Sequence, residues 1–478
     1  MEEVRDPMTW LRSRGTRVGL ALLLALAGLV LMMAAVALAA PEAILFLRQD
    51  ISKSPERVSA RPDLALGGDD DWLVVSWSEG YREYTEFGHV FVRAAHLPED
   101  WGSKDTVFWG GSDVCAHQSA MAVTGTTVHV AYTLKESDCT DPTTMTVRYR
   151  SCTLDPWWCT PPTGDGEVIT TTTRSILDVD LALDEAGDPH VVWTSCNEAG
   201  RDCDLYYARR NGGWSVSPRI EGSGATQGGN RAPAIAVAGG YAHVVWRFDG
   251  NLGSQFVYRR SSDGTNWTNQ VEFFTSDGDE PDVAARGSTV YAVYELCYKW
   301  NPPADQTGEC EEYYLLYRRS ENSGASWVER EVGTEAASSE DWAHIYDSRD
   351  GYLKALQPAV VLNDDDFPVV VWQADRTEDD GDYAIYYQYA ITETGAMTWA
   401  VTPRTTLNTN HPSELGFPAV GVIGAGSAQT IHVAYAGKPN PNPMDTTWNI
   451  VYSSTPEMWD RYSHVMMPIM FRDQESDD

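Results

Sequence analysis

The chain has 478 residues, of which 35 are basic and 69 acidic, so its formal net charge is −34 at pH 7. This balance argues against nucleic acid as a partner, because phosphate contacts need a basic surface. The 18 Trp, 23 Tyr, 39 Gly and 25 Pro accompany almost no helical periodicity after residue 45, which predicts an all-β protein.

The first forty residues predict export. Residues 1–17 carry four arginines and form a basic, cytoplasmic segment. Residues 18–40 are apolar throughout and end near Ala37-Leu38-Ala39, which is the layout of a signal peptide cleaved after Ala39. The run is also long enough to cross a bilayer as an N-terminal hydrophobic helix, so a transmembrane anchor stays open. Both interpretations place residues 41–478 outside the cytoplasm, secreted or at the cell surface, because positive charge stays inside.

Seven copies of one phrase fill the rest of the chain. Each has an apolar run that opens near a proline, a polar turn, and a second run that ends in Trp or Tyr, as in Pro233–Trp246. The copies begin at residues 62, 119, 178, 233, 281, 358 and 418. A repeat of this length made of short strands predicts a β-propeller of seven four-stranded blades, which forms one domain over residues 41–478.

A third strand in each repeat is rich in Tyr and Arg, as in Asp204–Arg210 and Tyr313–Ser320, and a poorer fourth strand follows. We expect the first strands to line the centre and the aromatic side chains to fill the wedges between blades. We expect the arginines of the third strands to lie further out and reach water. One strand is still needed to close the seventh blade, and residues 43–47 and 463–469 compete for that place.

The cysteines support an exported domain, because all 8 follow the apolar segment and an even number in such a chain predicts disulfides. Their spacing lacks paired C-x2-C units, so a zinc site is the weaker interpretation. The expected pairs are Cys196 with Cys203, Cys297 with Cys310, Cys152 with Cys159, and Cys115 with Cys139.

Two turns after third strands, at residues 261–267 and 320–327, each begin with Ser, end with Trp, and carry Asp or Asn and then Gly between them. These turns resemble the Asp box of bacterial neuraminidase repeats. In such a box, Asp or Asn caps backbone amides, Gly permits a positive φ, and Trp packs between strands. The matching residues are Ser261, Asp263, Gly264 and Trp267 in one turn, and Ser320, Asn322, Gly324 and Trp327 in the other.

The resemblance implies a sialidase-like propeller. Sialidases of this fold hold the substrate carboxylate with three arginines, use a Tyr activated by Glu as nucleophile, and use an Asp as acid. Their first arginine precedes the first innermost strand in an R-I-P word. Here Arg61-Pro62 is one residue off and Arg231-Ala232-Pro233 opens the fourth repeat, so Arg231 is the one catalytic candidate. No complete set of three arginines stands at comparable places, and these sialidases have six blades.

Ligands of propellers bind where the loops after second strands meet the loops that lead into each blade. Carboxylates and aromatic rings in these loops suit sugar binding, and they suit a solvated rim equally well. The candidate ligand-binding residues are Glu79, Tyr84, Asp249, Glu295, Trp300, Trp342, Asp375 and Arg376. The inserted segment 335–356 is the best single region for specificity.

No cofactor is expected and no metal site is assigned. The acidic turns 68–71 and 363–366 offer hard oxygen ligands for calcium, although Asp is common in such turns for conformational reasons. His129, His190, His243 and His432 recur at one place in the second strand, which indicates a structural position.

The sequence therefore favours an extracellular recognition module that binds a glycan or a surface protein, held at the membrane if the N-terminal helix is uncleaved. The alternative is a divergent glycoside hydrolase of the exo-sialidase type. Fold alone does not decide between them.

Overall fold

The computed structural model divides into two units, residues 1–45 and residues 46–478, and the described residues all belong to the second. None of the helices in the described part is long and apolar enough to cross a membrane, and residues 18–40 lie outside that part. The structure describes residues 49–455 except the segments 54–56, 68–71, 82–86, 98–100, 111–113, 137–143, 162–163, 198–201, 222–228, 251–252, 276–279, 302–308, 329–343, 348–354, 376–382, 394–395, 400–404, 407–414, 425–428 and 438–448.

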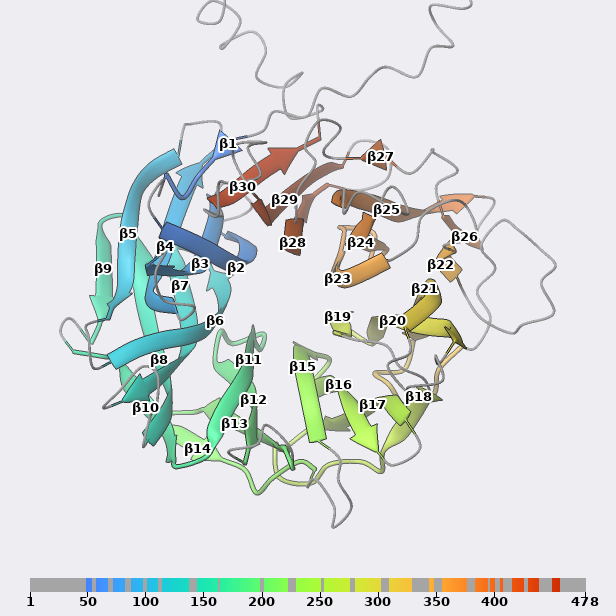
Figure 1. Cartoon of the computed structure of the whole chain (residues 1–478), viewed down its shortest axis with the longest axis horizontal. Coiled ribbons are helices and arrows are strands. Elements are labelled where there is room, and N and C mark those ends of the chain that lie inside the picture. The colour runs from blue at the N-terminus through green and yellow to red at the C-terminus, as the bar shows by residue number, and fades with distance from the viewer. Residues whose placement is uncertain are drawn as a thin grey trace, which may run out of the picture. The chain divides into compact units, whose positions relative to one another are not determined.

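Seven antiparallel sheets form a closed ring (Figure 1). We number them as blades in chain order. The strands are, in blade 1, β2 (Arg57–Gly67), β3 (Trp72–Tyr81), β4 (Phe87–His96) and β5 (Trp101–Trp109); in blade 2, β6 (Val114–Thr124), β7 (Thr127–Glu136), β8 (Thr144–Leu154), β9 (Trp157–Thr160) and β10 (Glu167–Thr172); in blade 3, β11 (Ser175–Leu183), β12 (Pro189–Cys196), β13 (Asp204–Arg210) and β14 (Trp214–Val216); in blade 4, β15 (Gly229–Ala238), β16 (Tyr241–Gly250), β17 (Gly253–Ser261) and β18 (Val271–Thr275); in blade 5, β19 (Asp282–Arg286), β20 (Thr289–Asn301), β21 (Glu309–Ser320) and β22 (His344–Asp347); in blade 6, β23 (Ala355–Leu362), β24 (Pro368–Asp375), β25 (Tyr383–Glu393), β26 (Ala396–Trp399) and β27 (Thr405–Thr406); and in blade 7, β28 (Leu415–Ile423), β29 (Thr430–Gly437), β30 (Asn449–Ser454) and β1 (Gln49–Asp50).

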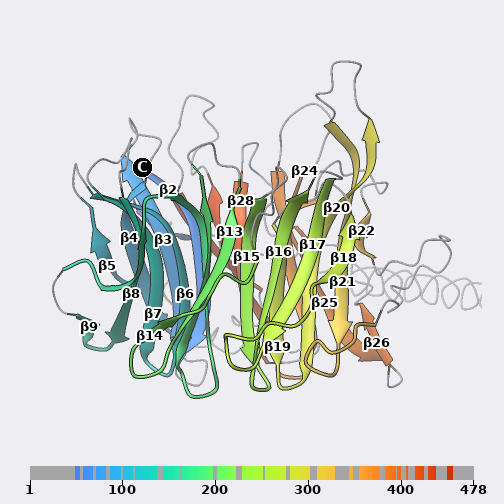
Figure 2. The same cartoon turned by 90° about the horizontal axis from the view of Figure 1, so that it is seen from below.

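The ring confirms the seven-bladed propeller. Each innermost strand, the first of its blade, contacts the innermost strand of the next blade, and β28 contacts β2 to complete the circle. Figure 2 shows the blades from the side, with their strands running across the thickness of the ring. The blades pack on one another without pairing their strands, and this radial repetition leaves only short strand edges, which the neighbouring blades protect.

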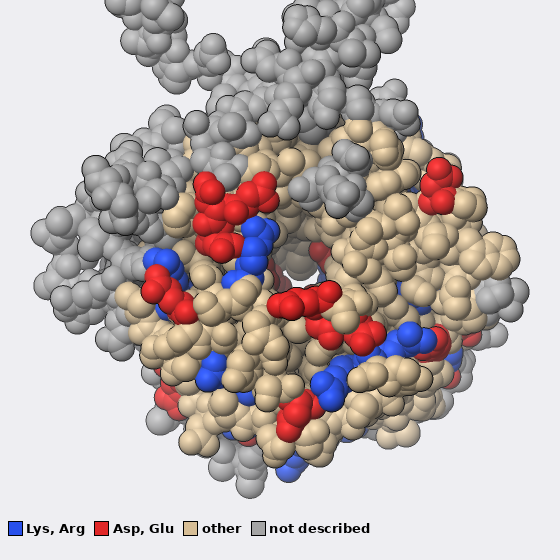
Figure 3. Space-filling model, turned by 180° about the vertical axis from the view of Figure 1, so that it is seen from behind, with Lys and Arg blue, Asp and Glu red and all other residues tan. Residues whose placement is uncertain are grey.

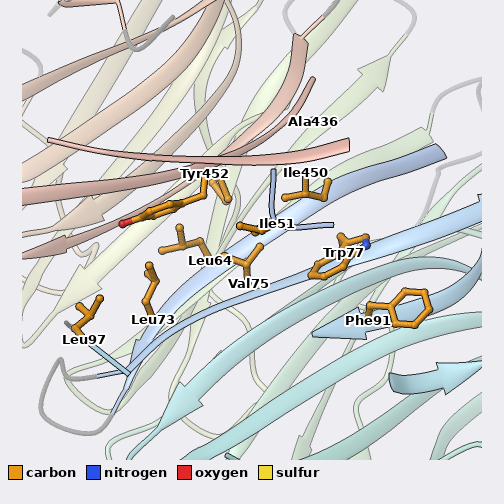
Figure 4. Close-up of a cluster of buried hydrophobic side chains, with 12 residues drawn as sticks. Ile51, Leu64, Leu73, Val75, Trp77, Phe91, Leu97, Ala436, Ile450 and Tyr452 are labelled. Atoms are coloured by element: carbon orange, nitrogen blue, oxygen red, sulfur yellow. The ribbon is translucent and has the colours of Figure 1, made fainter. Parts of the chain in front are cut away.

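The N-terminal segment closes the ring. Gln49 pairs with Tyr452 and Asp50 with Val451, so β1 is the outer strand of blade 7. The next residue, Ile51, is fully buried, and Figure 4 shows it beside Ile450 in the cluster between blades 7 and 1. The closing strand thus comes from the N-terminal side, a few residues after segment 43–47. Segments 43–47 and 463–469 both lie outside the described residues.

Seven apolar clusters occupy the junctions between blades, one at each junction. Trp77, Trp193, Trp246 and Trp372 lie in second strands, a few residues before the strands end, and are almost fully buried in these clusters. The expected aromatic wedges are confirmed. Large flat rings fill the volume between sheets that diverge from the centre.

The sequence predicts that the arginines of the third strands reach water. In the structure, their guanidinium groups instead donate hydrogen bonds to carbonyl oxygens. Arg259 donates to the carbonyl of Ile220 at 2.9 Å, and Arg318 donates to that of Phe273 at 2.9 Å. Each acceptor belongs to the outer part of the preceding blade. The equivalent Arg150 in blade 2 is only 9% exposed. These guanidinium groups satisfy carbonyls at the outer junctions that would otherwise lack donors.

The recurring histidines bind tyrosines within the blades. In four blades the His Nδ1 lies 2.6–2.8 Å from a Tyr hydroxyl of the neighbouring third strand. Burial lowers the pKa of His243 to about 4 and that of His432 to about 3. The four histidines are therefore neutral parts of the core. The pairs are His129 with Tyr149, His190 with Tyr207, His243 with Tyr258, and His432 with Tyr452.

The turn after β21 has its own network. Ser320 Oγ accepts the amide of Gly324 at 2.8 Å, and Asn322 Oδ1 accepts that of Ser326 at 2.8 Å. Gly324 has a φ of 76°, and a methyl group there would fall 1.8 Å from the hydroxyl of Tyr258. The turn after β17 is alike: Asp263 accepts two backbone amides, Ser261 Oγ accepts that of Gly264, and Trp267 stacks edge-on against Tyr207 at 5.2 Å. Both turns fasten a blade to its predecessor.

Two predicted disulfides are present, Cys152–Cys159 and Cys196–Cys203. Cys115 is also disulfide-bonded. Cys139 and the side chains of Cys297 and Cys310 lie outside the described residues.

Candidate functional site

The innermost strands share an irregularity at one end of the central channel, the end at which the second strands finish. In six blades a register shift places two residues of the innermost strand opposite one residue of the second strand, which is a β-bulge. The residue just before Pro in five blades has a φ of 45–53°. Proline excludes the right-handed helical region for its predecessor, which contributes to this choice.

We call the seven equivalent positions the mouth ring. Non-glycine residues with positive φ are uncommon and concentrate at functional sites. The mouth ring is Arg61, Gln118, Asp178, Ala232, Glu280, Gln357 and Phe417.

Two residues further along each innermost strand lies a second layer, in which Asp and Ala alternate. Asp63, Asp180 and Asp282 occupy blades 1, 3 and 5, whereas the equivalent residues of the other four blades are alanines. Each carboxylate accepts the amide of its own next residue at 2.8 Å and an amide of the next blade at 2.7 Å. The inner edges of these strands have no further strand to pair with, so the carboxylates supply the missing acceptors.

Burial raises the pKa of all three carboxyl groups. Desolvation is the largest cause, and the backbone amides oppose it. The pKa of Asp63 rises to about 6 and that of Asp282 to about 7, while that of Asp180 is raised well above its ordinary value. Figure 3 shows an open channel at the centre of one face, with acidic and basic side chains beside it.

Several mouth-ring side chains connect neighbouring blades. Gln118 Oε1 accepts the amide of Val179 at 3.2 Å, and Asp178 Oδ2 accepts that of Ala232 at 3.1 Å. Gln357 Oε1 accepts the amide of Phe417 at 2.6 Å. These bonds hold the strained backbone of the mouth in place.

Arg61 differs from these residues. Its guanidinium lies 5.4 Å from the ring centroid of Phe417 in a cation–π contact, and within the described chain it makes no hydrogen bond or ion pair. The side chain is half-buried. In a chain of net charge −34, a half-buried arginine without a carboxylate partner marks a place that can receive an anionic group.

Two more polar groups near the mouth lack partners among the described residues. The buried Nδ1 of His117 has no hydrogen-bond partner, and neither has the buried Oε1 of Gln373. Burial, together with the positive charges of Arg61 and Lys135, lowers the pKa of His117 to about 4, so this imidazole is neutral. Buried polar groups are nearly always bonded, so unbonded ones need an explanation.

Arg231, the catalytic candidate, is engaged with a carboxylate in blade 4. Its Nε lies 3.1 Å from Asp249 Oδ2, and Arg247 Nε lies 2.5 Å from Asp249 Oδ1. Asp249 is a predicted ligand-binding residue, and it also accepts a bond from Ser254. The two arginines thus share one carboxylate.

The sequence suggests that Glu79 and Glu295 lie on the rim, but both are buried in the structure. The side chain of Glu79 is fully buried, accepts the indole N–H of Trp77 at 3.1 Å, and forms an ion pair with Lys104 at 3.1 Å. Glu295 is 1% exposed. Both follow the second-strand aromatic closely, so the core encloses them.

The side chains of the other predicted ligand-binding residues lie outside the described part of the structure. Trp300 and Asp375 belong to the described strands β20 and β24, but their side chains lie outside the described set, as do Tyr84, Trp342 and Arg376. Most of segment 335–356 and the turn 68–71 also lie outside it. In the turn 363–366, Asn363 Oδ1 accepts the amides of Asp365 and Phe367, which gives that side chain a conformational role. No group of three His, Cys, Asp or Glu side chains among the described residues could hold a metal ion.

Sequence reasoning missed the mouth ring almost entirely. It named Arg61 only in the Arg-Pro word, and it passed over Gln357, Gln373 and Phe417. The available signal was positional: in five of the seven repeats the mouth-ring residue directly precedes the proline of the first apolar run.

No family model and no curated protein matches this chain. Among solved structures, it is similar to the α-L-arabinofuranosidase Arb93A of Fusarium graminearum, with 12% identity over 86% of this chain and 96% of that one, and a TM-score of 0.40. It is similar to an α-L-arabinanase of Penicillium chrysogenum, with 14% identity, the same coverage and a TM-score of 0.40. A sialidase of Trypanosoma rangeli gives 12% identity over 73% of this chain and 59% of that one, with a TM-score of 0.43. At such low identities and scores, the propeller assignment rests on the strand pairing of this chain itself.

Proposed function

We propose that this protein is an exported recognition module that binds an acidic glycan at the mouth of its propeller channel. The observation that carries the proposal is Arg61, half-buried, stacked on Phe417, and without a hydrogen bond or ion pair among the described residues. Guanidinium groups bind carboxylates through paired, charge-assisted hydrogen bonds. A sugar that bears a carboxylate matches this group and leaves its ring to contact the surrounding polar wall.

Two further features support a secreted or surface-anchored binder. The disulfides Cys152–Cys159 and Cys196–Cys203 suit an oxidising compartment. The mouth is a rigid frame, because side chains such as Gln118 and Asp178 bond the backbone of the next blade. Rigid, preorganised sites lose less entropy when they bind.

The turns Ser261–Trp267 and Ser320–Trp327 fit the Asp-box type, so we place the protein with the sialidase-like propellers. Their internal bonds and positive-φ glycines support this placement. The alternative function, a divergent glycoside hydrolase, requires arginines gathered on one substrate carboxylate. The sharing of Asp249 by Arg231 and Arg247 favours recognition over that chemistry.

A glycan microarray that carries sialylated, uronate-containing and neutral oligosaccharides tests the proposal. We expect the wild-type domain to bind acidic glycans and Arg61→Gln to lose about tenfold or more in affinity, since a charged hydrogen-bonded pair contributes about 1.5–3 kcal/mol. Arg209→Gln is the matched control. The side chain of Arg209 makes no hydrogen bond or ion pair among the described residues. Its backbone lies opposite His190 in the sheet of blade 3, at the end away from the mouth ring.

Equal losses in the two variants would show only a general effect of charge. A folded wild-type domain that binds no glycan on the array would refute the proposal.

A further inference from the structure

Two glutamine side chains and a glycine come together at the junction of blades 6 and 7, next in sequence to Phe417, whose ring contacts Arg61. Gln357 and Gln373 come from β23 and β24, and Gly416 comes from β28 just before Phe417. A methyl group on Gly416 would lie 3.4 Å from Gln357 Oε1 and 3.7 Å from Gln373 Oε1. The two amide oxygens therefore flank the same small space, and the absence of a side chain at Gly416 leaves that space to other atoms.

The two oxygens differ in how they are bonded. Gln357 Oε1 accepts the amide of Phe417 at 2.6 Å, and a carbonyl oxygen keeps a second lone pair. Gln373 is 5% exposed, and its buried Oε1 has no hydrogen-bond partner within the described chain. A buried acceptor left without a donor costs about 1–3 kcal/mol. The protein bears this cost when no ligand is bound. Backbone strain lies nearby as well, because Gln357 has a φ of 53°.

The Oε1 atoms of Gln357 and Gln373 have the same hydrogen-bonding role. Both atoms that face the space are acceptors, so the group that fits between them must bring donors. A sugar with two adjacent hydroxyl groups brings two donors at a suitable separation and no charge. Arg61, on the other side of Phe417, is a donor and a cation.

We propose that Gln357, Gln373 and Gly416 form a second subsite, which binds a vicinal diol of the glycan whose carboxylate is held by Arg61. This assignment rests on the proposed function and adds the orientation of the ligand: the acidic group lies toward blade 1 and the diol toward blades 6 and 7. It also predicts that acidic sugars whose diol is blocked bind poorly, although their charge is unchanged.

Stability measurements on Gln373→Met separate this role from a structural one. Methionine keeps the unbranched shape and removes the buried amide, so the variant should be as stable as the wild type or more stable in urea unfolding. A clear loss of stability would mean that the amide is bonded within the fold, and it would overturn the proposal.

Binding is tested with an acidic oligosaccharide found on the array and with its analogue in which the hydroxyl groups are O-methylated and the carboxylate is kept. The wild type should bind the methylated analogue about tenfold less tightly or worse. Gln373→Met and Gly416→Ala should bind the unmodified glycan about tenfold less tightly and should lose most of the discrimination between the two ligands. Gly213→Ala is the control, because a methyl group there meets nothing within 4 Å.

The outcomes separate the two proposals. If the wild type binds the glycan but the variants discriminate against the methylated analogue as strongly as it does, the second subsite is refuted and the role of Arg61 stands. If the wild type binds no acidic glycan, the proposed function fails and the subsite fails with it.

Discussion

Replacing Asp282 with alanine tests how the innermost strands are held around the channel. Asp282 accepts the amides of Val283 at 2.8 Å and Val360 at 2.7 Å, so it joins blade 5 to blade 6. Alanine occupies the equivalent place in four other blades, so the backbone tolerates it. Loss of an acceptor costs about 1 kcal/mol for each amide that water can still reach, and we expect Asp282→Ala to lose about 2 kcal/mol of unfolding free energy at pH 5.

The effect depends on pH in a definite direction. Desolvation raises the pKa of Asp282 to about 7, from its ordinary value of 3.8. Between these two values the folded protein binds more protons than the unfolded chain, so the wild type loses stability as the pH rises. Above pH 7 the half-buried carboxyl group of Asp282 is ionised in the folded protein. The unfolding free energy that Asp282 contributes relative to alanine is then smaller. The cost of Asp282→Ala is therefore expected to be larger at pH 5 than at pH 8.

Equilibrium urea unfolding at pH 5 and pH 8 measures both quantities. Comparison of variants is necessary because the buried histidines have the opposite trend: their lowered pKa values make the wild type lose stability as the pH falls below 6.5. Asp365→Ala, on an exposed turn, is the control and should change little at either pH. A cost for Asp282→Ala that is equal at both pH values, or larger at pH 8, would refute the reasoning.

Three further changes test other parts of the account. Gly324→Ala should cost at least about 3 kcal/mol of unfolding free energy in urea, because its methyl group would fall 1.8 Å from the Tyr258 hydroxyl. Gly240 also has a positive φ but nothing within 4 Å of an added methyl group, so Gly240→Ala should cost about 1–2 kcal/mol. Equal costs would contradict the contact with Tyr258. His243→Phe should flatten the decline in stability between pH 6.5 and pH 4, since burial lowers the pKa of His243 to about 4; an unchanged slope of the urea midpoint against pH would contradict this. Arg150→Met should destabilise the junction of blades 1 and 2 by about 2 kcal/mol, because Arg150 donates to the carbonyls of Val107 and Pro161; a neutral result would place those carbonyls in water.

The blades could be predicted from the sequence because their determinants repeat. A proline lies in or just before five of the seven first strands, and a Trp or Tyr lies in each second strand, where it packs between blades. The closing strand could not be predicted, since β1 is only two residues long and has no periodicity of its own.

The mouth ring was hidden for a different reason. Its members share a place beside the channel, and five of the seven share a positive φ, but they share no residue type. The alternation of Asp63, Asp180 and Asp282 with alanine is visible in the sequence once the blades are aligned. Its meaning depends on amides of the next blade, which only the folded ring brings within 2.7 Å. Glu79 shows the converse, a polar residue after a second strand that Trp77 and Lys104 draw into the core.

The central claim is recognition without chemistry at the channel mouth. Its most direct test is to incubate the folded domain with an acidic oligosaccharide found on the array, beside Arg61→Gln and Arg231→Ala, and to measure the bound fraction and the mass of the recovered glycan. The account predicts saturable binding that Arg61→Gln weakens about tenfold or more, and a glycan recovered intact. A shortened glycan that appears with the wild type and is missing with Arg231→Ala would contradict it and establish a hydrolase.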